Sequence, residues 1–391
     1  MQIIDTEKKP IKMWLTDIED GAMEQAKNLA NLPFTFSHVA IMPDSHQGYG
    51  MPIGGVLATK DVIIPNAVGV DIGCGMCAVK TSLTDISTET LKIILGKIRE
   101  QIPVGFNKHQ EDQDENLMPF PQDWNNINYP IVAQEQFNAL KSLGTLGGGN
   151  HFIEIQKGSD GHIWIMIHSG SRNLGKQVAD YYNKVAIELN AKWHSNVPAE
   201  HELAFLPVDS EEGQSYIREM QYCVDFALAN RGLMMNRIMN IFSAQFEWDV
   251  NTTYEIINIA HNYAALEKHF GKEVWVHRKG ATLASADTIG IIPGSQGTKS
   301  YIVKGKGNIQ SFNSCSHGAG RKMGRKEAER SLNLDEEVRK LDEAGVLHAI
   351  RGVKDLDEAP GAYKDIDVVM KNQEDLVEIL VELTPLAVVK G

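Results

Sequence analysis

Cysteine is scarce in this sequence: the chain of 391 residues contains four, Cys74, Cys77, Cys223 and Cys315. So few thiols cannot build the disulfide framework of a small secreted domain. Each cysteine is better interpreted as a metal ligand or as a small buried hydrophobic residue. The small number of cysteines therefore does not exclude a metal site.

Long apolar runs, repeats and low-complexity tracts are also missing. No stretch of about 18 apolar residues, which could span a bilayer, occurs. Residues 1–15 lack the basic and apolar segments of a secretory leader. We therefore expect a cytoplasmic protein with no membrane partner. The lack of repeats and of Pro/Ser-rich linkers argues against a string of independent modules.

The sequence has no excess of positive charge. Its formal net charge is −13, which argues against a protein that coats nucleic acid through a general basic surface. A cleft lined with arginine, lysine and metal ions can still attract phosphate on an acidic body. Any binding of nucleic acid must therefore be local.

Helical and strand patterns alternate along the chain, and they predict one large α+β core. Helical spacing of apolar residues occurs in segments 16–30, 87–101, 131–143, 173–193, 213–246, 334–344 and 373–383. Strand patterns occur in segments 152–156, 162–168, 254–259, 274–277 and 301–303. In segment 162–168 three isoleucines alternate with other residues, so His168 is expected on the opposite face. The methionines near Met234 are typical of core packing.

The first candidate ligands lie among glycines near residue 70. Asp71 and Cys74 are three residues apart on a glycine-flanked turn, so a carboxylate and a thiolate can converge on one cation. Cys74 and Cys77 also form a C-x-x-C pattern, which occurs in structural zinc sites and redox pairs. The second close pair that a structural zinc site usually needs is missing, because the other two cysteines are isolated.

Two glycine-rich turns add further candidates. Three glycines run into Asn150 and His151, and Asn150 and Glu154 offer an amide and a carboxylate suited to the sugar or base edge of a nucleotide. Ordinary turn formation explains the same residues. In the second turn a strand ends at His168, and Arg172 follows just before a helix. That arrangement is typical of a phosphate site.

Imidazoles recur at such strand ends. His151, His168 and His261 can join Asp71 and Cys74 around metal. A thiolate that bridges two cations, each completed by imidazoles and one also by a carboxylate, is chemically sensible for Mn²⁺ or Zn²⁺. The sequence does not establish that these residues meet.

A further histidine, His317, lies between small residues, with Ser316 before it and Gly318, Ala319 and Gly320 after it. This leaves room for a bulky phosphoryl adduct, and a neutral imidazole is a competent nucleophile toward phosphorus. The alternative is a solvent-exposed histidine in a glycine-rich helix cap.

These segments together resemble the RtcB family of RNA ligases. The similar segments are MPDSHQGYG, GVDIGCGM, GTLGGGNHFIEI, HSGSRNLG, HRKGAT, PGSQGTKSY, SCSHGAGR, DEAPGAYKDID and the terminal VVKG. They follow the family's order from Asp44 to Lys390. The resemblance implies a single RtcB-like α+β domain over residues 1–391, with central sheets around a metal cleft.

The resemblance also implies roles for individual residues. His317 would attack the α-phosphate of GTP, forming a histidine–GMP intermediate and pyrophosphate. Two Mn²⁺ ions, bridged by Cys74, would be held by Asp71, Cys74, His151, His168 and His261. The guanylate pocket would comprise Asn150, Glu154, Ser295, Ser300, Ala319, Gly320 and Lys390. Contributors to binding of the RNA ends would be Asp44, Arg172 and Lys279.

The implied reaction joins an RNA 3′-phosphate or 2′,3′-cyclic phosphate end to a 5′-hydroxyl end, in tRNA splicing or RNA repair. The cyclic phosphate is hydrolysed to a 3′-phosphate, GMP moves onto it from His317, and the 5′-hydroxyl attacks while GMP leaves. The partners would be RNA and GTP, with room for an archease-type activator. Two other functions stay open: a metal-dependent phosphodiesterase or phosphatase acting on RNA ends, which would not need His317, and an inactive RNA-end binder.

Overall fold

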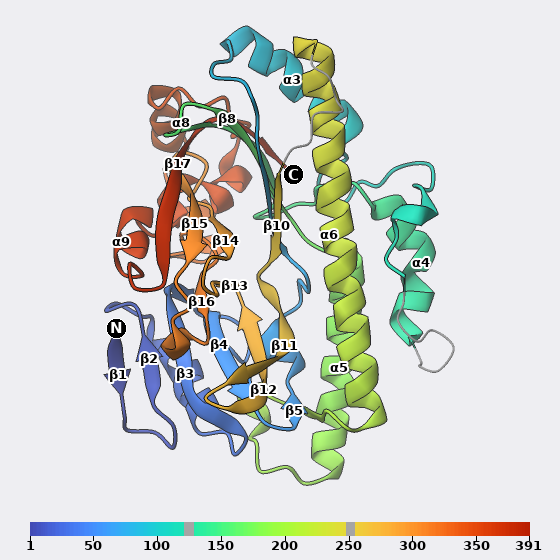
Figure 1. Cartoon of the computed structure of the whole chain (residues 1–391), viewed down its shortest axis with the longest axis vertical. Helices are drawn as coiled ribbons and strands as arrows, with labels where there is room; N and C mark the ends of the chain where they lie inside the picture. Colours follow the sequence, from blue (N-terminus) through green and yellow to red (C-terminus); the bar gives the residue numbers. More distant parts are fainter. Residues whose placement is uncertain (121–128, 248–254) are drawn as a thin grey trace.

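The computed structural model describes residues 1–120, 129–247 and 255–391. Two large β-sheets form its frame, and helices cover them, which confirms the expected α+β class (Figure 1). The α-helices of the described residues are α1 (Asp20–Ala30), α2 (Pro65–Val68), α3 (Thr88–Gln101), α4 (Pro130–Ser142), α5 (Arg172–Lys192), α6 (Glu211–Phe246), α7 (Arg325–Ser331), α8 (Leu334–Glu343) and α9 (Ile366–Lys371).

The six-stranded sheet has the order β1-β2-β3-β4-β12-β11. Its strands are β1 (Gln2–Ile4), β2 (Ile11–Met13), β3 (Thr35–His46), β4 (Ile53–Thr59), β11 (Asn262–His269) and β12 (Lys272–Lys279). Strand β2 runs parallel to β3, and the other neighbours are antiparallel. Alternate residues of β3 point to opposite faces. Val39 packs in the same core as Leu29 of α1, whereas Ala40 packs in a second core on the other face.

The seven-stranded sheet has the order β10-β6-β8-β7-β17-β15-β14. Its strands are β6 (Gly75–Lys80), β7 (Phe152–Gly158), β8 (Ile163–Ser169), β10 (Ile256–Ala260), β14 (Ile289–Ile292), β15 (Ser300–Gly305) and β17 (Val377–Lys390). The isoleucines of β8 pack in one core with α3 and α6, while Trp164 and Met166 pack in another. The predicted alternation in this strand is therefore confirmed.

Two small two-stranded sheets complete the β-structure. One pairs β13 (Ala281–Leu283) with β16 (Ser314–Ser316), and the other pairs β5 (Val62–Ile63) with β9 (Leu206–Pro207). The first of them leads the chain to residue 317.

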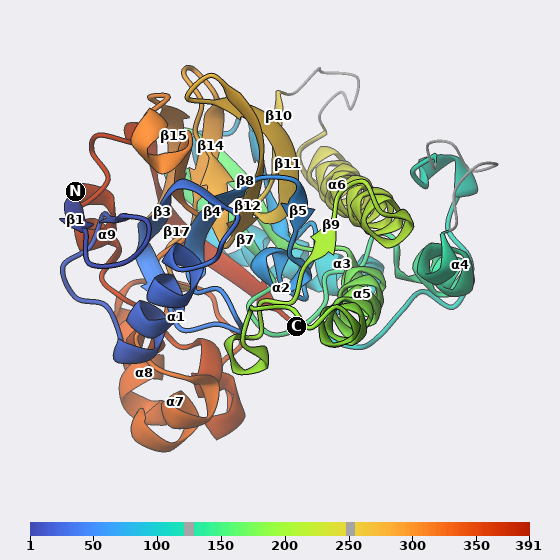
Figure 2. The same ribbon diagram turned by 90° about the horizontal axis from the view of Figure 1, so that it is seen from below.

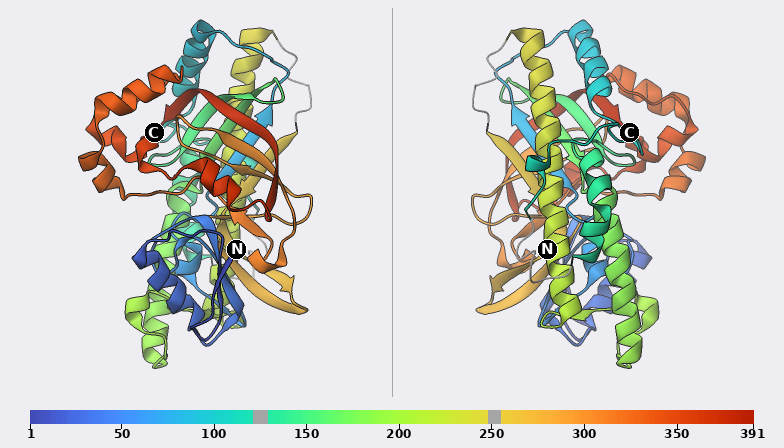
Figure 3. Two further views of the ribbon diagram at one scale, coloured as in Figure 1. Left: turned by 90° about the vertical axis from the view of Figure 1, so that its left-hand side faces the viewer. Right: turned by 90° about the vertical axis from the view of Figure 1, so that its right-hand side faces the viewer.

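Helix α6 lies against both large sheets. It contacts β6, β8 and β10 of one sheet and β11 of the other, and it runs along one side of the molecule with α5 and α4 beyond it (Figures 1 and 2). Helices α7 and α8 lie away from these three helices (Figures 2 and 3). Met234 and Met235 of α6 are fully buried, which confirms the prediction of core packing.

One predicted helix is wrong. Segment 373–383 has apolar residues at helical spacing, but residues 377–390 form strand β17, which pairs with β15 and β7. The pairing partners come from distant parts of the sequence, and their tertiary contacts outweigh the local pattern. The predicted strand 254–259 is β10, although Tyr254 itself lies outside the described residues. No described helix combines the length and the apolar character needed to cross a membrane.

His261 marks the junction of the two large sheets. It is the one residue between β10 of the seven-stranded sheet and β11 of the six-stranded sheet. A side chain at this position can therefore meet residues carried by either sheet.

Candidate active site

The five residues expected to bind metal come together at this junction. Asp71 and Cys74 lie on the turn before β6, His151 lies just before β7, and His168 lies near the end of β8. Strands β10, β6, β8 and β7 are consecutive neighbours in the sheet. Their pairing therefore brings the turn and the three imidazoles, including His261, to one edge.

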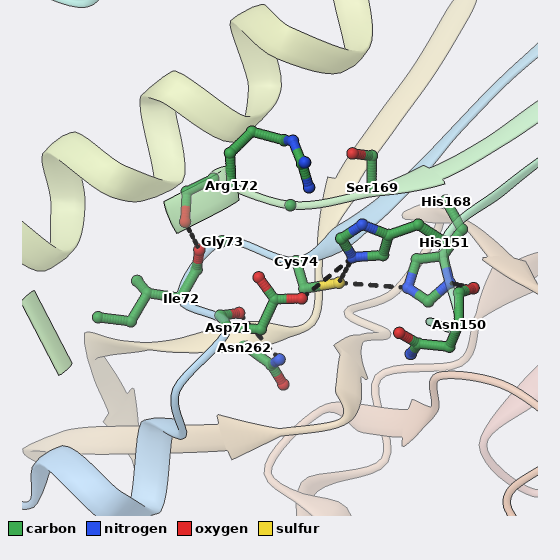
Figure 4. A network of polar contacts seen from close by, with 12 residues as sticks. Asp71, Ile72, Gly73, Cys74, Asn150, His151, His168, Ser169, Arg172 and Asn262 are labelled. Carbon is green, nitrogen blue, oxygen red and sulfur yellow. Dashed lines mark hydrogen bonds and ion pairs between the residues drawn. The ribbon is translucent and has the colours of Figure 1, made fainter. Parts of the chain in front are cut away.

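Cys74 is the centre of the group. Its Sγ lies 3.2 Å from Nε2 of His168 and 3.5 Å from Nε2 of His151, and Figure 4 shows both contacts as dashed lines from the sulfur. Nε2 of His151 lies 3.1 Å from Oδ2 of Asp71. Two sets of three can each hold a metal ion, with ligand atoms within 4.8 Å of one another: Cys74 with His168 and His261, and Cys74 with Asp71 and His151.

Hydrogen bonds behind the imidazoles fix which nitrogen is available. Nδ1 of His151 bonds to the carbonyl of Leu146 at 2.9 Å, and Nδ1 of His168 bonds to the carbonyl of Asn150 at 3.0 Å. Because a carbonyl oxygen only accepts, each Nδ1 carries the proton and each Nε2 keeps its lone pair. Nδ1 of His261 is buried without a hydrogen-bond partner among the described residues. Such an atom fits a ring nitrogen that bonds a cation.

The surroundings of the group favour neutral imidazoles. Burial, followed by the charges of neighbouring histidines, lowers the pKa of His168 and of His261 well below the usual value. Burial raises the pKa of Asp71, but the close contact between its carboxylate and the His151 ring has the larger, opposite effect and brings the value to about 2. Burial and the Asp71 carboxylate raise the pKa of the Cys74 thiol well above normal. A bound cation would reverse that effect, since metal binding deprotonates a coordinating thiol.

The C-x-x-C pattern does not form a site of its own. Cys77 lies within β6, is fully buried and packs in the apolar core below the sheet. All four cysteines are free, so Cys74 and Cys77 are not joined by a disulfide. Cys77 is a packing residue, as a small hydrophobic side chain can be.

Arg231 of α6, which no sequence motif indicated, supports the turn that carries Asp71 and Cys74. Its side chain is completely buried, and it donates hydrogen bonds to the carbonyls of Gly73 at 2.9 Å and Ser169 at 2.8 Å. Gly73 has φ +76°, and a Cβ there would meet the carbonyl oxygen of Cys223 at 2.8 Å. The sequence offered one sign of this role: Arg231 lies among the apolar residues that form the buried face of the helix.

Asn262 holds the same turn from β11 and was also missed. Its Nδ2 donates to the carbonyl of Asp71 at 3.0 Å, and its Oδ1 accepts from the backbone N–H of Gly280 at 2.7 Å. This one side chain therefore links the metal-binding turn with the end of β12 (Figure 4). The asparagine directly after His261 gave no sign of this role in the sequence.

Arg172 lies beside the candidate metal ligands, at the start of α5 (Figure 4). Its guanidinium donates to Oγ1 of Thr145 and to the carbonyl of Gly105, both at 2.9 Å. A Cβ at Gly147, which has φ +93°, would lie 1.9 Å from the guanidinium. The glycine-rich turn thus gives Arg172 its space, and the cation lies within electrostatic range of Asp71 and Cys74.

His317 lies against the metal group rather than in an exposed helix cap. Its ring centroid is 4.8 Å from that of His261. Nδ1 contacts Oδ2 of Asp44 at 2.6 Å, and the same oxygen accepts the backbone N–H groups of His317 and Gly318 at 3.0 and 3.3 Å. Asp44 is completely buried and contacts His317, and its implied contact with RNA stays a prediction. With Nδ1 donating to Asp44, Nε2 of His317 keeps its lone pair.

A cavity of about 220 Å³ opens beside His317 and His168. Six of the seven residues expected to hold guanylate line it: Asn150, Glu154, Ser295, Ala319, Gly320 and Lys390. The seventh, Ser300, lies behind the wall, where its Oγ accepts hydrogen bonds from Gln156 and from the backbone N–H of Gly294, both at 3.1 Å. Lys390 lies in β17 opposite Phe152, so it is an ordered part of the sheet.

Lys279 is not among the residues that line this cavity. Its Nζ donates to the backbone carbonyls of Tyr49 at 2.5 Å and Asn66 at 3.0 Å. Burial lowers its pKa to about 7. These bonds tie two turns together, so the structure gives Lys279 a supporting position.

Glu358, a buried carboxylate that no sequence motif indicated, gathers cations at the cavity wall. It forms ion pairs with Arg321 at 3.2 Å, Arg325 at 3.1 Å and Lys390 at 3.5 Å, and it accepts a hydrogen bond from Tyr363. Three cations therefore face one cavity of an acidic protein. The ion pairs join residues that are far apart in sequence, so no local pattern indicated them.

Glu154 also lines the cavity, and its carboxyl is held largely protonated. Burial raises its pKa to about 8, although Lys390 and the hydrogen bond from Gln156 act in the other direction. The aromatic rings of Phe152 and Tyr363 also line the cavity. Both lie within segments that carry the family resemblance, but neither was singled out.

Comparisons with known proteins agree with this geometry. The sequence pattern of the family described as tRNA-splicing ligase RtcB matches residues 25–391. The RNA-splicing ligase RtcB of Escherichia coli K12 is 38% identical over 411 aligned residues, which cover 100% of this chain and 99% of that protein. The tRNA-splicing ligase RtcB of Nanoarchaeum equitans is 32% identical, covering 98% and 95%, and that of Thermococcus kodakarensis is 32% identical, covering 95% and 92%. The chain belongs to the RtcB family.

Proposed function

We propose that this protein is a GTP- and Mn²⁺-dependent RNA ligase that joins 3′-phosphate or 2′,3′-cyclic phosphate ends to 5′-hydroxyl ends. The observation that carries the proposal is the position of His317, whose ring centroid lies 4.8 Å from that of the metal-site residue His261. Both the metal-site residue His168 and His317 line the same cavity. Membership of the family and the names of its relatives support an RNA substrate.

His317 is the nucleophile in this proposal. Its Nδ1 is engaged by Asp44, so Nε2 presents its lone pair to the α-phosphorus of GTP and displaces pyrophosphate. Asp44 holds the ring in one orientation and balances the charge that the imidazole gains when it bonds phosphorus. It is a positioning residue in this proposal, because its carboxylate contacts Nδ1 of His317 and accepts the backbone N–H groups of His317 and Gly318.

The donor set fits two divalent cations. One thiolate, three imidazoles and one carboxylate suit a borderline metal, and Cys74 belongs to both sets of three. Two Mn²⁺ ions bound there would polarise the phosphoryl oxygens and orient the attacking group, as in other two-metal phosphoryl transfers. The deprotonated Nε2 atoms of His151 and His168 keep their lone pairs directed at this space.

The cavity beside His317 would bind guanylate. Glu154 would accept hydrogen bonds from the N–H groups of the base, and the rings of Phe152 and Tyr363 offer apolar faces to it. Arg321 and Lys390 would attract the phosphates. Asn150, Ser295, Ala319 and Gly320 line the remaining wall.

The RNA ends would bind on the metal side of the cavity, with Arg172 as a phosphate contact. The cyclic phosphate is hydrolysed to a 3′-phosphate, GMP moves onto that phosphate from His317, and the 5′-hydroxyl then displaces GMP. We infer that residues 1–391 act as one catalytic unit, because the site draws on positions from Asp44 to Lys390. tRNA splicing and RNA repair both fit this chemistry, as does help from an archease-type activator.

Labelling with GTP tests the proposal. Incubation with [α-³²P]GTP and Mn²⁺ should give an acid-labile, base-stable protein adduct, as expected for a phosphoramidate. His317→Ala should abolish the adduct, whereas His194→Ala, which changes an exposed histidine on another part of the surface, should keep it. Label retained in His317→Ala would reject this nucleophile.

The same labelling experiment distinguishes the ligase from the two other functions. A metal-dependent phosphodiesterase or phosphatase acting on RNA ends needs the metal ligands but no covalent nucleotide. It would release phosphate or open cyclic phosphate without labelling the wild-type protein. An inactive RNA-end binder would do neither.

A further inference from the structure

The roles proposed above leave one imidazole of the cavity unused. His46 is the last residue of β3, where it pairs with Ile53 of β4. Both residues line the cavity together with His317 and His168. His46 is half-buried, so part of its side chain is open to whatever occupies this space.

The hydrogen bonding of His46 leaves Nε2 available. Its Nδ1 contacts the backbone carbonyl oxygen of Asp44 at 3.2 Å. A carbonyl oxygen only accepts, so Nδ1 carries the proton and Nε2 keeps its lone pair. No residue in the described part of the chain donates a hydrogen bond to that Nε2. Asp44 thus engages two imidazoles, His46 through its carbonyl and His317 through its carboxylate.

The charges around His46 keep the ring neutral. Burial, opposed in part by the hydrogen bond to Asp44, lowers its pKa to about 4. His317 and Lys364 act in the same direction as burial, while the Asp44 carboxylate acts against it. At neutral pH the ring is therefore a base with an open lone pair.

Only some steps of the proposed reaction need such a base. His317 attacks GTP through a nitrogen that already lacks a proton, and the RNA 3′-phosphate that receives GMP is already an anion. A neutral nucleophile loses a proton when water opens the cyclic phosphate and when the 5′-hydroxyl seals the strand. Every substrate passes through the sealing step, and a 3′-phosphate substrate avoids the hydrolysis.

We propose that His46 is the general base of the sealing step. The inference rests on the proposed ligase function. The 5′-hydroxyl oxygen forms a bond to the activated 3′-phosphorus, and its proton passes to Nε2 of His46. The bond from that phosphorus to the GMP oxygen breaks, and GMP leaves with the electron pair. The proton then passes from His46 to the departing phosphate or to water.

His46→Asn tests this role with little change of structure. The amide nitrogen of asparagine can occupy the place of Nδ1 and donate to the Asp44 carbonyl, but it offers no group at the place of Nε2. The matched control is His162→Asn. His162 is also half-buried and also contacts a backbone carbonyl through Nδ1, that of Thr81 at 3.2 Å, but it does not line the cavity.

We expect His46→Asn to slow the sealing step far more than it slows formation of the GMP adduct on His317. With an RNA 3′-phosphate it should accumulate the activated RNA carrying 3′-linked GMP. Single-turnover sealing of that activated RNA should be about 10² times slower or more, as loss of a general base predicts. Added imidazole should restore part of the sealing rate in His46→Ala. His162→Asn should match wild type throughout.

Three results would contradict the proposed role of His46. Sealing by His46→Asn within about twofold of wild type would overturn the assignment. Equal loss of adduct formation and sealing, without rescue by imidazole, would show that His46 acts only by holding Asp44 and His317. A wild-type protein that forms no adduct and seals no activated RNA would reject the proposed ligase function, and this inference with it.

Discussion

Single side chains in the cavity owe their protonation states to contacts behind them. The carbonyls of Leu146 and Asn150 fix the tautomers of two metal-site histidines, and Asp44 fixes that of His317. Outer contacts of this kind orient reactive groups before a ligand arrives. The surroundings of Glu154 also set its protonation state, so the binding of nucleotide should depend on pH.

Glu154 should make the affinity for guanine nucleotide rise with pH. Its pKa in the free protein is about 8, whereas accepting hydrogen bonds from the base requires the ionised carboxylate. Binding must therefore release a proton below pH 8, and affinity should increase by up to about tenfold per pH unit before it levels off above pH 8. Calorimetric titration with GMP between pH 6 and 9 measures this. In Glu154→Gln the dependence should flatten, and a wild-type affinity that falls as pH rises would contradict the assignment.

Residue types and spacing predicted five candidate metal ligands, because each lies on a glycine-flanked turn or at the end of a strand, and the fold brings these residues together. The residues that support them were harder to find. Arg231 and Glu358 act through contacts with residues that lie far away in the sequence. Lys279 lies at a strand end, where its Nζ donates to two backbone carbonyls. Its implied contribution to RNA-end binding stays a prediction.

At the scale of elements, most helices followed from local periodicity, and β17 did not. Its sequence alternates short apolar groups with glutamates in a way that also fits a helix. Strand formation depends on neighbours: β15 on one side and β7 on the other provide the backbone partners. The order of strands could not be predicted for the same reason, because it is set by pairings between distant segments.

Helix α6 should support the metal site through Arg231. Replacing this buried residue by methionine leaves the carbonyls of Gly73 and Ser169 without their donor, so the free energy of unfolding should fall by about 3 kcal/mol. Metal affinity should fall as well, since Gly73 lies between two ligands. Urea denaturation and metal titration measure the two effects. Asn236→Ala, an exposed change on the same helix, should alter stability by no more than about 0.5 kcal/mol.

Equal stability of Arg231→Met and the wild-type protein would show that α6 does not support the turn through this side chain. Reduced stability with unchanged metal affinity would limit Arg231 to a role in folding.

At the scale of the whole molecule, an acidic chain concentrates cations in one place. The net charge is −13, yet Arg321, Arg325 and Lys390 face the cavity beside the metal group. The site lies where the two large sheets join, and His261 is the residue at which the chain passes from one to the other. Composition excluded a general basic surface, but only the fold reveals this local concentration.

The central claim is that Cys74 bridges two divalent cations beside His317. Crystals of the protein grown with Mn²⁺ and measured at the manganese absorption edge test it directly. We predict two anomalous peaks that share the Cys74 sulfur, one completed by Asp71 and His151 and the other by His168 and His261, and both lost or weakened in Cys74→Ala. A single peak, or two peaks that do not share this sulfur, would contradict the account.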